Sequence, residues 1–445
     1  MNIDLAIPVF SDGDQLAFLT SLAESLRSKG LQIAFLSTTE IATTSLRSRG
    51  FEVVDLYEGL DRSVRPSIEC MRGVELRYGI HSLRSFVYPE LTYDWAHGID
   101  ELLTCAVHVL ARIDRFASEN TVRAYFNYVG AEVVRRSVEV IARLHGAHTI
   151  VGDVASFPQR FLFAKSEIGV QIPPIADDIT AEEIAHAESI VDQMLHHRKP
   201  FAPVSHLGFG LSNFRGAARL FRVLHRMPDV NASRLVAERV LRVARRVVGT
   251  ALYQDVKLDE PFVFFPLHLA NDSVITVRAP QFQRQEDLVA FVSERALPSG
   301  YKLYVKPHIG ARDAYSVEMM TKISRMPNVR LVKPTINPHD MIDRAAVNLV
   351  INSTTGFEGI LHRKPVVVLG NPYYRGHGLT VDVDGLRELP AAIERAITFV
   401  PDRELMLRFI AHYWRMTYEG VYGDLAEDNI SRFAAALEHR LEMLS

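Results

Sequence analysis

A hydroxyl-rich turn lies in the second half of the chain, where the apolar run NLVI is followed by NSTTGFEGI (352–360). Ser353, Thr354 and Thr355 can cap a helix that starts here, and the first helical N–H groups beyond them have no intrahelical acceptor. Together with the positive end of the helix dipole, these N–H groups favour a bound anion such as a phosphate. Glu358 cannot bind phosphate because it carries the same charge, but it can accept hydrogen bonds from ribose hydroxyls or a nucleobase. The alternative is that the hydroxyls only cap the helix.

Polar turns follow three other apolar runs in the same half of the chain. Asn271, Asp272 and Ser273 come after FVFFPLHLA, Lys306 and His308 lie in YVKPHIG, and NPYYR (371–375) follows VVVLG. If these runs are strands of one parallel sheet, their carboxyl ends meet at one edge, where open α/β sheets bind ligands. The turns therefore predict a nucleotide site. The predicted nucleotide- and donor-binding residues are Ser273, Lys306, His308, Asn352, Ser353, Thr354, Thr355, Gly356, Glu358 and Tyr374.

Two side chains in these turns can act as an acid, a base or a nucleophile. His308, with Lys306 close by, can meet the phosphate or protonate a leaving group. A loop histidine can also be structural or simply solvated. Asp272 either forms an Asx turn or directs its carboxylate at the ligand. Both alternatives stay open for each residue.

Acidic residues outside these turns give weaker signals. Asp12 and Asp14 follow the first predicted strand, where they either cap the next helix or face an acceptor molecule. The stretch VDVDG (381–385) resembles a metal-binding DxD motif, but we expect a strand end there. We therefore predict no metal and no cofactor.

The elements that must position these side chains follow from the hydrophobic periodicity. IDLAIPV reads as a strand, DQLAFLTSLAESLRSKG as an amphipathic helix, and LQIAFLS, FEVVDL and AHTIVGDV as further strands. A second alternating unit starts at FVFFPL (262–267) and runs through PVVVLG. Such βαβ alternation predicts parallel, doubly wound sheets. The predicted fold class is α/β of GT-B type, with two Rossmann-like domains facing a central cleft, a helical linker and C-terminal helices.

The predicted division of the chain follows this pattern. We expect an N-terminal Rossmann-like domain over 1–195, a helical linker over 196–258 and a C-terminal Rossmann-like domain over 259–400. We expect helices over 401–445 to pack back on the N-terminal domain. Within these ranges, residues 60–145 and 159–261 have a mainly helical pattern.

Composition excludes several classes of protein. The chain has 445 residues, 48% of them hydrophobic, and a net charge of −3. These values indicate a globular protein of two domains without general affinity for nucleic acid. Its two cysteines have no metal-type spacing, and MNIDLAIPVF lacks the features of a signal peptide. We therefore expect a cytoplasmic protein.

An arginine-rich segment over 214–246 contains few acids. One interpretation is a pair of solvated helices that link the domains. The other is a surface that docks on anionic lipid or an acidic glycan, which would place the protein peripherally on the inner face of the cytoplasmic membrane.

Taken together, FPLHLANDSVI, YVKPHIG and INSTTGFEGILHRKPVVVLGNPYYRGHGLT resemble the capsule polysaccharide biosynthesis family, which includes the bacterial β-Kdo transferases. That family has a strand followed by Asp-Ser, a KxHP turn and a TSTxGFEAL…GKPV…G…FY…GLT block. The resemblance covers about residues 262–380, with Ile309 where the family has proline. In the first half, Asp153, Phe157-Pro158 and 169–171 stand where the family has an acidic residue (glutamate), FP and a GVN-like element.

The resemblance implies a glycosyltransferase of surface polysaccharide biosynthesis. It implies a CMP-activated acidic sugar donor held by the C-terminal domain (259–400), with Kdo the best-attested donor in the family. It also implies a glycan or glycolipid acceptor held by the N-terminal domain (1–195), and retention of anomeric configuration. Asp272 matches the family's candidate nucleophile, and Asp153 is our candidate for the acid–base group. The site needs no metal on this interpretation, because the helix dipole, His308 and Lys306 can offset the phosphate charge.

Three other interpretations compete with this one. A nucleotide-sugar epimerase of the two-Rossmann type also places Ser/Thr, Gly and Glu on a nucleotide. A CDP-glycerol-type glycerophosphotransferase is a second enzyme alternative. The third is a non-catalytic assembly or export partner that has kept the nucleotide-binding fold.

Overall fold

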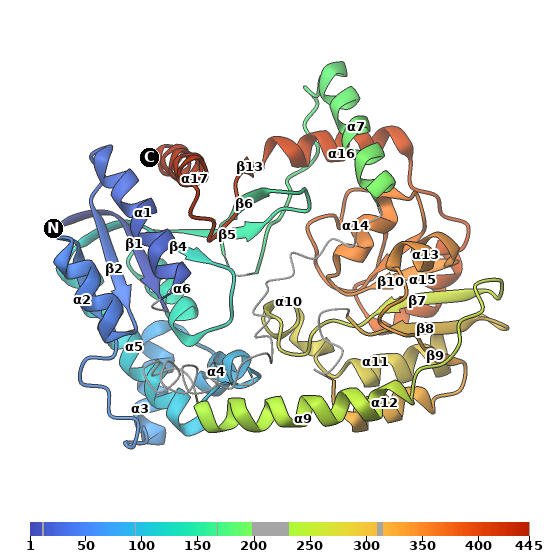
Figure 1. Cartoon of the computed structure of the whole chain (residues 1–445), viewed down its shortest axis with the longest axis horizontal. Helices are drawn as coiled ribbons and strands as arrows, with labels where there is room; N and C mark the ends of the chain where they lie inside the picture. The colour runs from blue at the N-terminus through green and yellow to red at the C-terminus, as the bar shows by residue number, and fades with distance from the viewer. Residues whose placement is uncertain (11–12, 94, 167, 198–230, 309–314, 445) are drawn as a thin grey trace. The chain divides into compact units, whose positions relative to one another are not determined.

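The chain forms two compact units in a computed structural model, shown in Figure 1, which describes residues 1–10, 13–93, 95–166, 168–197, 231–308 and 315–444. Unit 1 contains Met1–Val170, the start of helix α9 up to Ala237, and the residues from Thr417 onward. Unit 2 contains 171–197 and Glu238–Met416. The predicted domain boundary at 195 therefore lies inside unit 2.

Unit 1 is built on a seven-stranded sheet of order β13-β6-β5-β4-β1-β2-β3. Strands β5, β4, β1, β2 and β3 are parallel, while β6 and β13 are antiparallel additions at one edge. Its strands are β1 (Asn2–Val9), β2 (Ile33–Ser37), β3 (Glu52–Asp55), β4 (Thr121–Tyr128), β5 (His148–Val154), β6 (Arg160–Ala164) and β13 (Tyr418–Glu419). Its helices are α1 (Asp14–Ser28), α2 (Glu40–Ser48), α3 (Ile68–Tyr78), α4 (Leu83–Leu91), α5 (Ile99–Glu119), α6 (Val133–Leu144) and α17 (Glu427–Glu442).

Both faces of this sheet are covered, as the near-continuous burial of its central strands requires. Helices α1, α2 and α17 bury one face, where Phe433 of α17 packs with Phe18 of α1. Helices α4, α5 and α6 bury the other face. Of the predicted C-terminal helices, α17 thus packs on unit 1, whereas α16 (Arg403–Arg415) groups with unit 2.

Three strands of this sheet lie in segments that we predicted to be helical. Strand β4 falls within 60–145, β6 within 159–261 and β13 within the C-terminal segment. β4 is central, paired on both sides with β1 and β5, and four of its residues are buried in succession. A short apolar run of this kind takes its conformation from sheet pairing, which local periodicity does not reveal.

Unit 2 is built on a parallel six-stranded sheet of order β12-β11-β10-β7-β8-β9. Its strands are β7 (Phe262–Pro266), β8 (Lys302–Lys306), β9 (Val329–Leu331), β10 (Val347–Val350), β11 (Val366–Val368) and β12 (Val381–Asp382). Its helices are α7 (Ala181–His197), α9 (Ala232–Thr250, from Glu238), α10 (Ser273–Thr276), α11 (Gln285–Phe291), α12 (Val317–Ser324), α13 (Pro338–Arg344), α14 (Thr354–Leu361), α15 (Leu389–Ala396) and α16. The strand end predicted within 381–385 is confirmed as β12.

Helices α11, α12 and α15 cover one face of the unit 2 sheet, and α13 packs on the other. Strands β7, β8, β9 and β10 are each followed by a helix that leads to the next parallel strand, which is the doubly wound pattern, whereas turns join β11 to β12. The predicted fold class, two Rossmann-like α/β units, is confirmed. None of the helices in the described part of the chain is both long and apolar enough to span a bilayer.

Candidate functional site

The predicted nucleotide-binding turns meet at the carboxyl edge of the unit 2 sheet. Strand β7 lies between β8 and β10, and β11 lies on the far side of β10. The turns that begin at Leu267, Pro307 and Ile351 therefore follow three adjacent strands, and Leu369 starts the turn after the fourth. This is the edge at which doubly wound sheets bind ligands.

Asn352 joins three of these turns. Its side-chain nitrogen donates to Val274 O at 3.0 Å, and its side-chain oxygen accepts from Asn371 N at 2.8 Å. Its backbone N–H donates to His268 Nε2 at 3.4 Å. A β-carbon on Gly370 would lie 2.2 Å from the same amide oxygen, so only glycine fits there. Asn352 is thus in the predicted site, where it fixes the turns that surround the ligand.

Ser353 caps helix α14, which is the capping role that the sequence analysis considered for these hydroxyls. Its hydroxyl accepts from Thr355 N at 3.2 Å, and its carbonyl accepts from Gly356 N at 3.0 Å. Thr354, the first helical residue, is exposed, whereas Thr355 and Gly356 are buried. An anion at this turn would therefore meet Thr354 first, together with the dipole of α14.

Tyr374 holds this turn in place through its hydroxyl group. It is fully buried, and its hydroxyl donates to Ser353 O at 2.6 Å. Burial, with the charges of Asp382 and Glu358, raises the pKa of this phenol, so it stays a donor at all physiological pH values. Because the side chain is fully buried, we assign Tyr374 to holding the turn and not to contact with the ligand.

Tyr374→Phe is expected to lower the free energy of unfolding by about 1 kcal/mol and to weaken nucleotide binding severalfold, because Ser353 O loses a buried donor. Chemical unfolding and calorimetric titration measure the two effects. Tyr301→Phe, at the amino end of β8, removes the same atom from the opposite edge of the sheet and should leave nucleotide affinity unchanged. Equal affinities for wild type and Tyr374→Phe would show that this hydroxyl does not shape the site.

Glu358 lies in the second turn of α14 and is 4% exposed. All residues of α14 from Thr355 to Leu361 are buried, so the helix is embedded along its length. A carboxylate in such a place keeps its charge only where donors surround it. Its predicted contact with ribose or base stays a prediction.

Asp272 combines both alternatives that the sequence left open. It caps α10, and its side chain accepts from Val274 N at 3.0 Å. Its charge also acts on His308, where it opposes the effect of burial on the histidine pKa. One carboxylate is therefore anchored by the helix cap and lies near the predicted acid–base histidine. Ser273, the first residue of α10, is half-buried beside it.

His308 and Lys306 differ from the simple expectation of two cations at a phosphate. Burial lowers the pKa of His308, and the charge of Lys306 lowers it further. The imidazole is therefore neutral at pH 7 and offers a hydrogen bond, not a charge. Lys306 is 5% exposed, and its ammonium donates to Pro334 O at 3.1 Å. The positive charge of Lys306 still acts on the site, but its ammonium group is held by the hydrogen bond to Pro334 O.

The backbone of His308 is fixed by a buried tyrosine. His308 N donates to the hydroxyl of Tyr315 at 3.2 Å, and that hydroxyl donates to His268 O at 3.1 Å. Tyr315 is 4% exposed. The hydroxyl therefore couples the turn after β8 to the turn after β7.

His268 is a site residue that the sequence analysis missed. Gln285 brackets its backbone, accepting from His268 N at 2.8 Å and donating to His268 O at 3.0 Å. Burial, with the nearby His308, lowers the pKa of His268 to about 3. The neutral ring can then accept the Asn352 N–H at Nε2 and carry its proton on Nδ1. The signal was a histidine placed just beyond a fully apolar strand.

Acid should destabilise the protein partly through His268. Its folded pKa lies below the ordinary value of 6.5, so its contribution is complete above pH 6.5 and is lost as pH falls toward 3. Between pH 7 and 5, wild type should lose about 2 kcal/mol more unfolding free energy than His268→Gln. Urea unfolding at both pH values measures this difference. The exposed His148→Gln should behave as wild type, and an equal loss in His268→Gln would contradict the buried neutral state.

The two acids of VDVDG have structural partners. Asp382 accepts from Gly376 N at 2.9 Å and from Thr380 Oγ1 at 2.6 Å, and Asp384 pairs with Arg375. Within the described ranges, no group of three or more His, Cys, Asp or Glu side chains is arranged as a metal site. The expectation that no metal is needed stays a prediction.

Two of the predicted acids, Asp153 and Asp14, lie on different elements of unit 1. Asp153 is half-buried on β5, and its Oδ1 accepts from Val154 N at 2.8 Å. Asp14 is exposed in the first turn of α1, where the N-cap is Gly13 without a side-chain bond. Of the two alternatives for Asp14, capping of this helix is therefore wrong, although its charge still suits the positive helix end. Asp12 lies outside the described residues.

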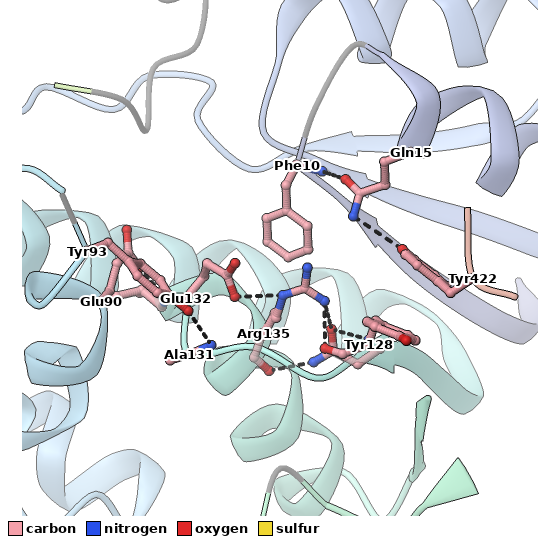
Figure 2. A network of polar contacts seen from close by, with 11 residues as sticks. Phe10, Gln15, Glu90, Tyr93, Tyr128, Ala131, Glu132, Arg135 and Tyr422 are labelled. Carbon is pink, nitrogen blue, oxygen red and sulfur yellow. Dashed lines mark hydrogen bonds and ion pairs between the residues drawn. The ribbon is translucent and has the colours of Figure 1, made fainter. Parts of the chain in front are cut away.

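Arg135 forms the centre of a polar network at the carboxyl edge of the unit 1 sheet, as Figure 2 shows. The side chain is 8% exposed and lies over the ring of Phe10, 4.3 Å from its centroid. It pairs with Glu132 at 2.7 Å and donates to Tyr128 O at 2.6 Å and to Asn127 Oδ1 at 3.3 Å. The guanidinium thereby ties the end of β4 to the start of α6.

Aromatic and amide groups surround this guanidinium (Figure 2). The ring of Tyr128 stacks on Tyr422 with centroids 3.8 Å apart. Gln15 donates to the Tyr422 hydroxyl at 3.2 Å and accepts from Phe10 N at 3.2 Å. Burial raises the pKa of Tyr128, and the charge of Asp153 raises it further, so this acid lies near the cluster. Aromatic rings beside amides and a paired charge are groups that can hold sugar hydroxyls and sugar faces.

Comparison with known proteins supports the resemblance found in the motifs. Residues 220–408 match the family described as capsule polysaccharide biosynthesis protein. The capsule polysaccharide modification protein LipA of Neisseria meningitidis serogroup B is 31% identical over 144 residues, which are 32% of this chain and 20% of LipA. Protein FixF of Sinorhizobium fredii is 25% identical over 175 residues, 39% of this chain and 42% of FixF. The chain thus spans well under half the length of these relatives.

A solved structure is also similar to this chain over part of its length. The KpsC β-Kdo 2,4 transferase of Thermosulfurimonas dismutans aligns with 73% of this chain and 92% of its own, with 15% identity and a TM-score of 0.41. The predicted recognition is confirmed as a match: residues 220–408, which hold every turn of the unit 2 site, match the model of the capsule polysaccharide biosynthesis family.

Proposed function

We propose, from this domain and its site, that the protein is a glycosyltransferase of capsular or lipopolysaccharide biosynthesis. It would transfer a sugar, Kdo in our proposal, from a CMP-activated donor to a glycan or glycolipid acceptor with retention of configuration. The observation that carries the proposal is the convergence of Asp272, His308 and Ser353 on one sheet edge inside the segment that matches the family.

Donor binding would use the start of α14. The exposed Thr354 and the helix dipole would receive the phosphate of CMP, and Glu358 would accept from the ribose or the base. The positive field of the buried Lys306 would offset the phosphate charge without direct contact. Ser353, Asn352 and Tyr374 would keep these groups in place.

The reaction would proceed by two displacements at the anomeric carbon. The Asp272 carboxylate would form a bond to that carbon as the bond to the CMP phosphate oxygen breaks, and CMP would leave with the electron pair. An acceptor hydroxyl would then displace Asp272, losing its proton to a base and restoring the carboxylate. Two inversions give net retention. The neutral His308 would donate a hydrogen bond to the departing phosphate.

The acceptor would bind at the carboxyl edge of the unit 1 sheet. The cluster of Phe10, Gln15, Tyr128, Arg135 and Tyr422 supports this placement, because its groups suit sugar hydroxyls and sugar faces. Asp153, our candidate base, lies at the same edge on β5. Its role stays a prediction, as does an acceptor-side role for Asp14.

Product analysis of the purified protein with three donors tests the proposal. We expect release of CMP from CMP-Kdo, with transfer of Kdo when a glycan acceptor is added. Interconversion of a UDP-sugar without an acceptor would instead identify an epimerase. Transfer of glycerophosphate from CDP-glycerol would identify a glycerophosphotransferase, and no turnover with any donor would indicate a non-catalytic partner.

A further inference from the structure

Helix α3 and the residues before it expose large apolar side chains to solvent. Val64 is 59% exposed, Ile68 68% and Leu76 85%. Fully burying a side chain of this size is worth about 1.5–3 kcal/mol. Three such side chains in a segment of 13 residues therefore leave a considerable driving force unused.

The helix itself is well defined, so this exposure is a property of the fold. Ser67 caps its start by accepting from Cys70 N at 3.1 Å, and Gly79 ends it in the left-handed conformation with φ of 63°. Tyr78 is buried and anchors the inner face, where its hydroxyl donates to Asp114 at 3.1 Å. The outer face of α3 is thus held toward solvent.

The exposed apolar residues alternate with arginines. Ile68, Arg72 and Leu76 are spaced four residues apart and so share one stripe of the helix. Arg65 precedes the stripe and pairs with Asp100 at 3.1 Å while its side chain stays 76% exposed. Gly73 lies on the same side, where an added β-carbon would meet no atom within 4 Å. We call Val64, Arg65, Ile68, Arg72 and Leu76 the α3 face.

The segment that carries the α3 face has a positive net charge although the whole chain is negative, and two of its arginines, Arg65 and Arg77, pair with acids of helix α5. Between residues 61 and 84 there are five arginines and three acids, giving +2, against −3 for the chain. Glu75 is engaged, since it accepts from Leu83 N at 2.7 Å, and Arg77 is paired with Asp114 at 2.6 Å. Arg84, the last of the five arginines, is exposed on the neighbouring helix α4, as is Tyr88. The remaining charges in the segment are Asp61, Arg62, Arg65, Glu69 and Arg72.

We propose that the α3 face docks on a bilayer surface that contains anionic lipids. Helices that lie in the membrane interface combine arginine with large apolar residues, and the α3 face has this composition, with a tyrosine nearby. Arginines interrupt the apolar residues, so the face lacks the continuous apolar centre of a stable protein interface. Arg65, Arg72 and Arg84 would meet the lipid phosphates while Ile68 and Leu76 enter the acyl boundary. This proposal rests on the α3 face alone and not on the arginine-rich 214–246 segment.

Flotation of the full chain with vesicles tests this proposal. We expect the full chain to bind vesicles of phosphatidylcholine that contain about 30% of the anionic lipid phosphatidylglycerol. Ile68→Glu combined with Leu76→Glu should lower the partition coefficient at least about tenfold, since two side chains lose their insertion and two negative charges are added. Because both positions are exposed, the variant should fold and keep wild-type nucleotide binding.

Val400→Glu provides a control in unit 2. Val400 is 59% exposed, so the change adds one negative charge, half that of the double variant, outside the α3 face and should leave partitioning within about twofold of wild type. Absence of wild-type binding to the anionic vesicles, or equal binding by the double variant, would overturn the proposal. So would self-association of wild type, measured by light scattering, that the double variant abolishes, because a second copy would then be the occupant of the face.

Discussion

Asp272→Asn is expected to reduce turnover by about 10³-fold or more while leaving nucleotide affinity within about threefold of wild type. Asparagine is as good a helix cap as aspartate, so the bond from Val274 N is kept and α10 stays in place. What is lost is the negative charge that would attack the anomeric carbon. Steady-state kinetics with CMP-Kdo and calorimetric titration with CMP measure the two quantities.

The matched control is Asp287→Asn on α11. It removes the same charge from unit 2, where Asp287 forms an exposed pair with Lys322 at 2.8 Å, and such pairs contribute little. We expect its turnover to equal that of wild type. Turnover of Asp272→Asn within tenfold of wild type would show that Asp272 is a structural cap and not a nucleophile.

Gly356→Ala is expected to destabilise the protein by about 1–3 kcal/mol and to weaken nucleotide binding at least about tenfold. Alanine is intrinsically better than glycine in a helix by about 1 kcal/mol, so an open site would be stabilised. At Gly356 the new β-carbon would lie 2.1 Å from the hydroxyl of Tyr374 and 2.6 Å from its Cζ. Tyr374 is fully buried and cannot rotate away, so either the ring or the Ser353 turn must shift.

Gly385→Ala is the control for this change. An added β-carbon there meets no atom within 4 Å, and the residue has an ordinary extended backbone with φ of −155°. Denaturant unfolding and CMP titration should give wild-type values. If Gly356→Ala also behaved as wild type, the contact between Gly356 and Tyr374 would not constrain the site.

Much of the site could be predicted because parallel sheets impose a simple rule. Once FVFFP, KLYVK, VNLV and VVV were recognised as consecutive strands, the residues after them had to share one edge, and the bonds of Asn352 to Val274 and Asn371 show that they do. Ser353 as a cap also followed from local chemistry alone. These inferences need only residue order and the direction of strands.

The residues that could not be predicted owe their roles to partners far along the chain. Tyr374 was taken as a ligand contact because its turn is polar, but its hydroxyl reaches back 21 residues to Ser353. His268 lay unnoticed in an apolar run, yet it contacts Asn352, 84 residues away. Strand β4 is defined by its pairing with β1 and β5 and not by its own periodicity. Sequence pattern carries no record of such distant contacts.

The neutral histidines also depend on burial that the sequence does not show. His308 and Lys306 looked like two cations at a phosphate, but burial removes the charge of the first, and Pro334 O holds the second. The phosphate charge would therefore be met chiefly by the exposed start of α14 and by the field of Lys306. This changes how a nucleotide would be bound, although the edge at which it binds stays as predicted.

Thermal stabilisation of the purified protein by CMP, CDP and UDP tests the central claim most directly. A nucleotide present at 100 times its dissociation constant stabilises the folded state by about 2.7 kcal/mol, a shift of a few degrees for a protein of this size. We predict the largest shift with CMP, its preservation in Asp272→Asn and its reduction to about half or less in Gly356→Ala, where the same CMP concentration is about 10 times the weakened dissociation constant. A larger shift with UDP than with CMP, or a CMP shift unchanged in Gly356→Ala, would contradict a CMP-sugar site at the start of α14.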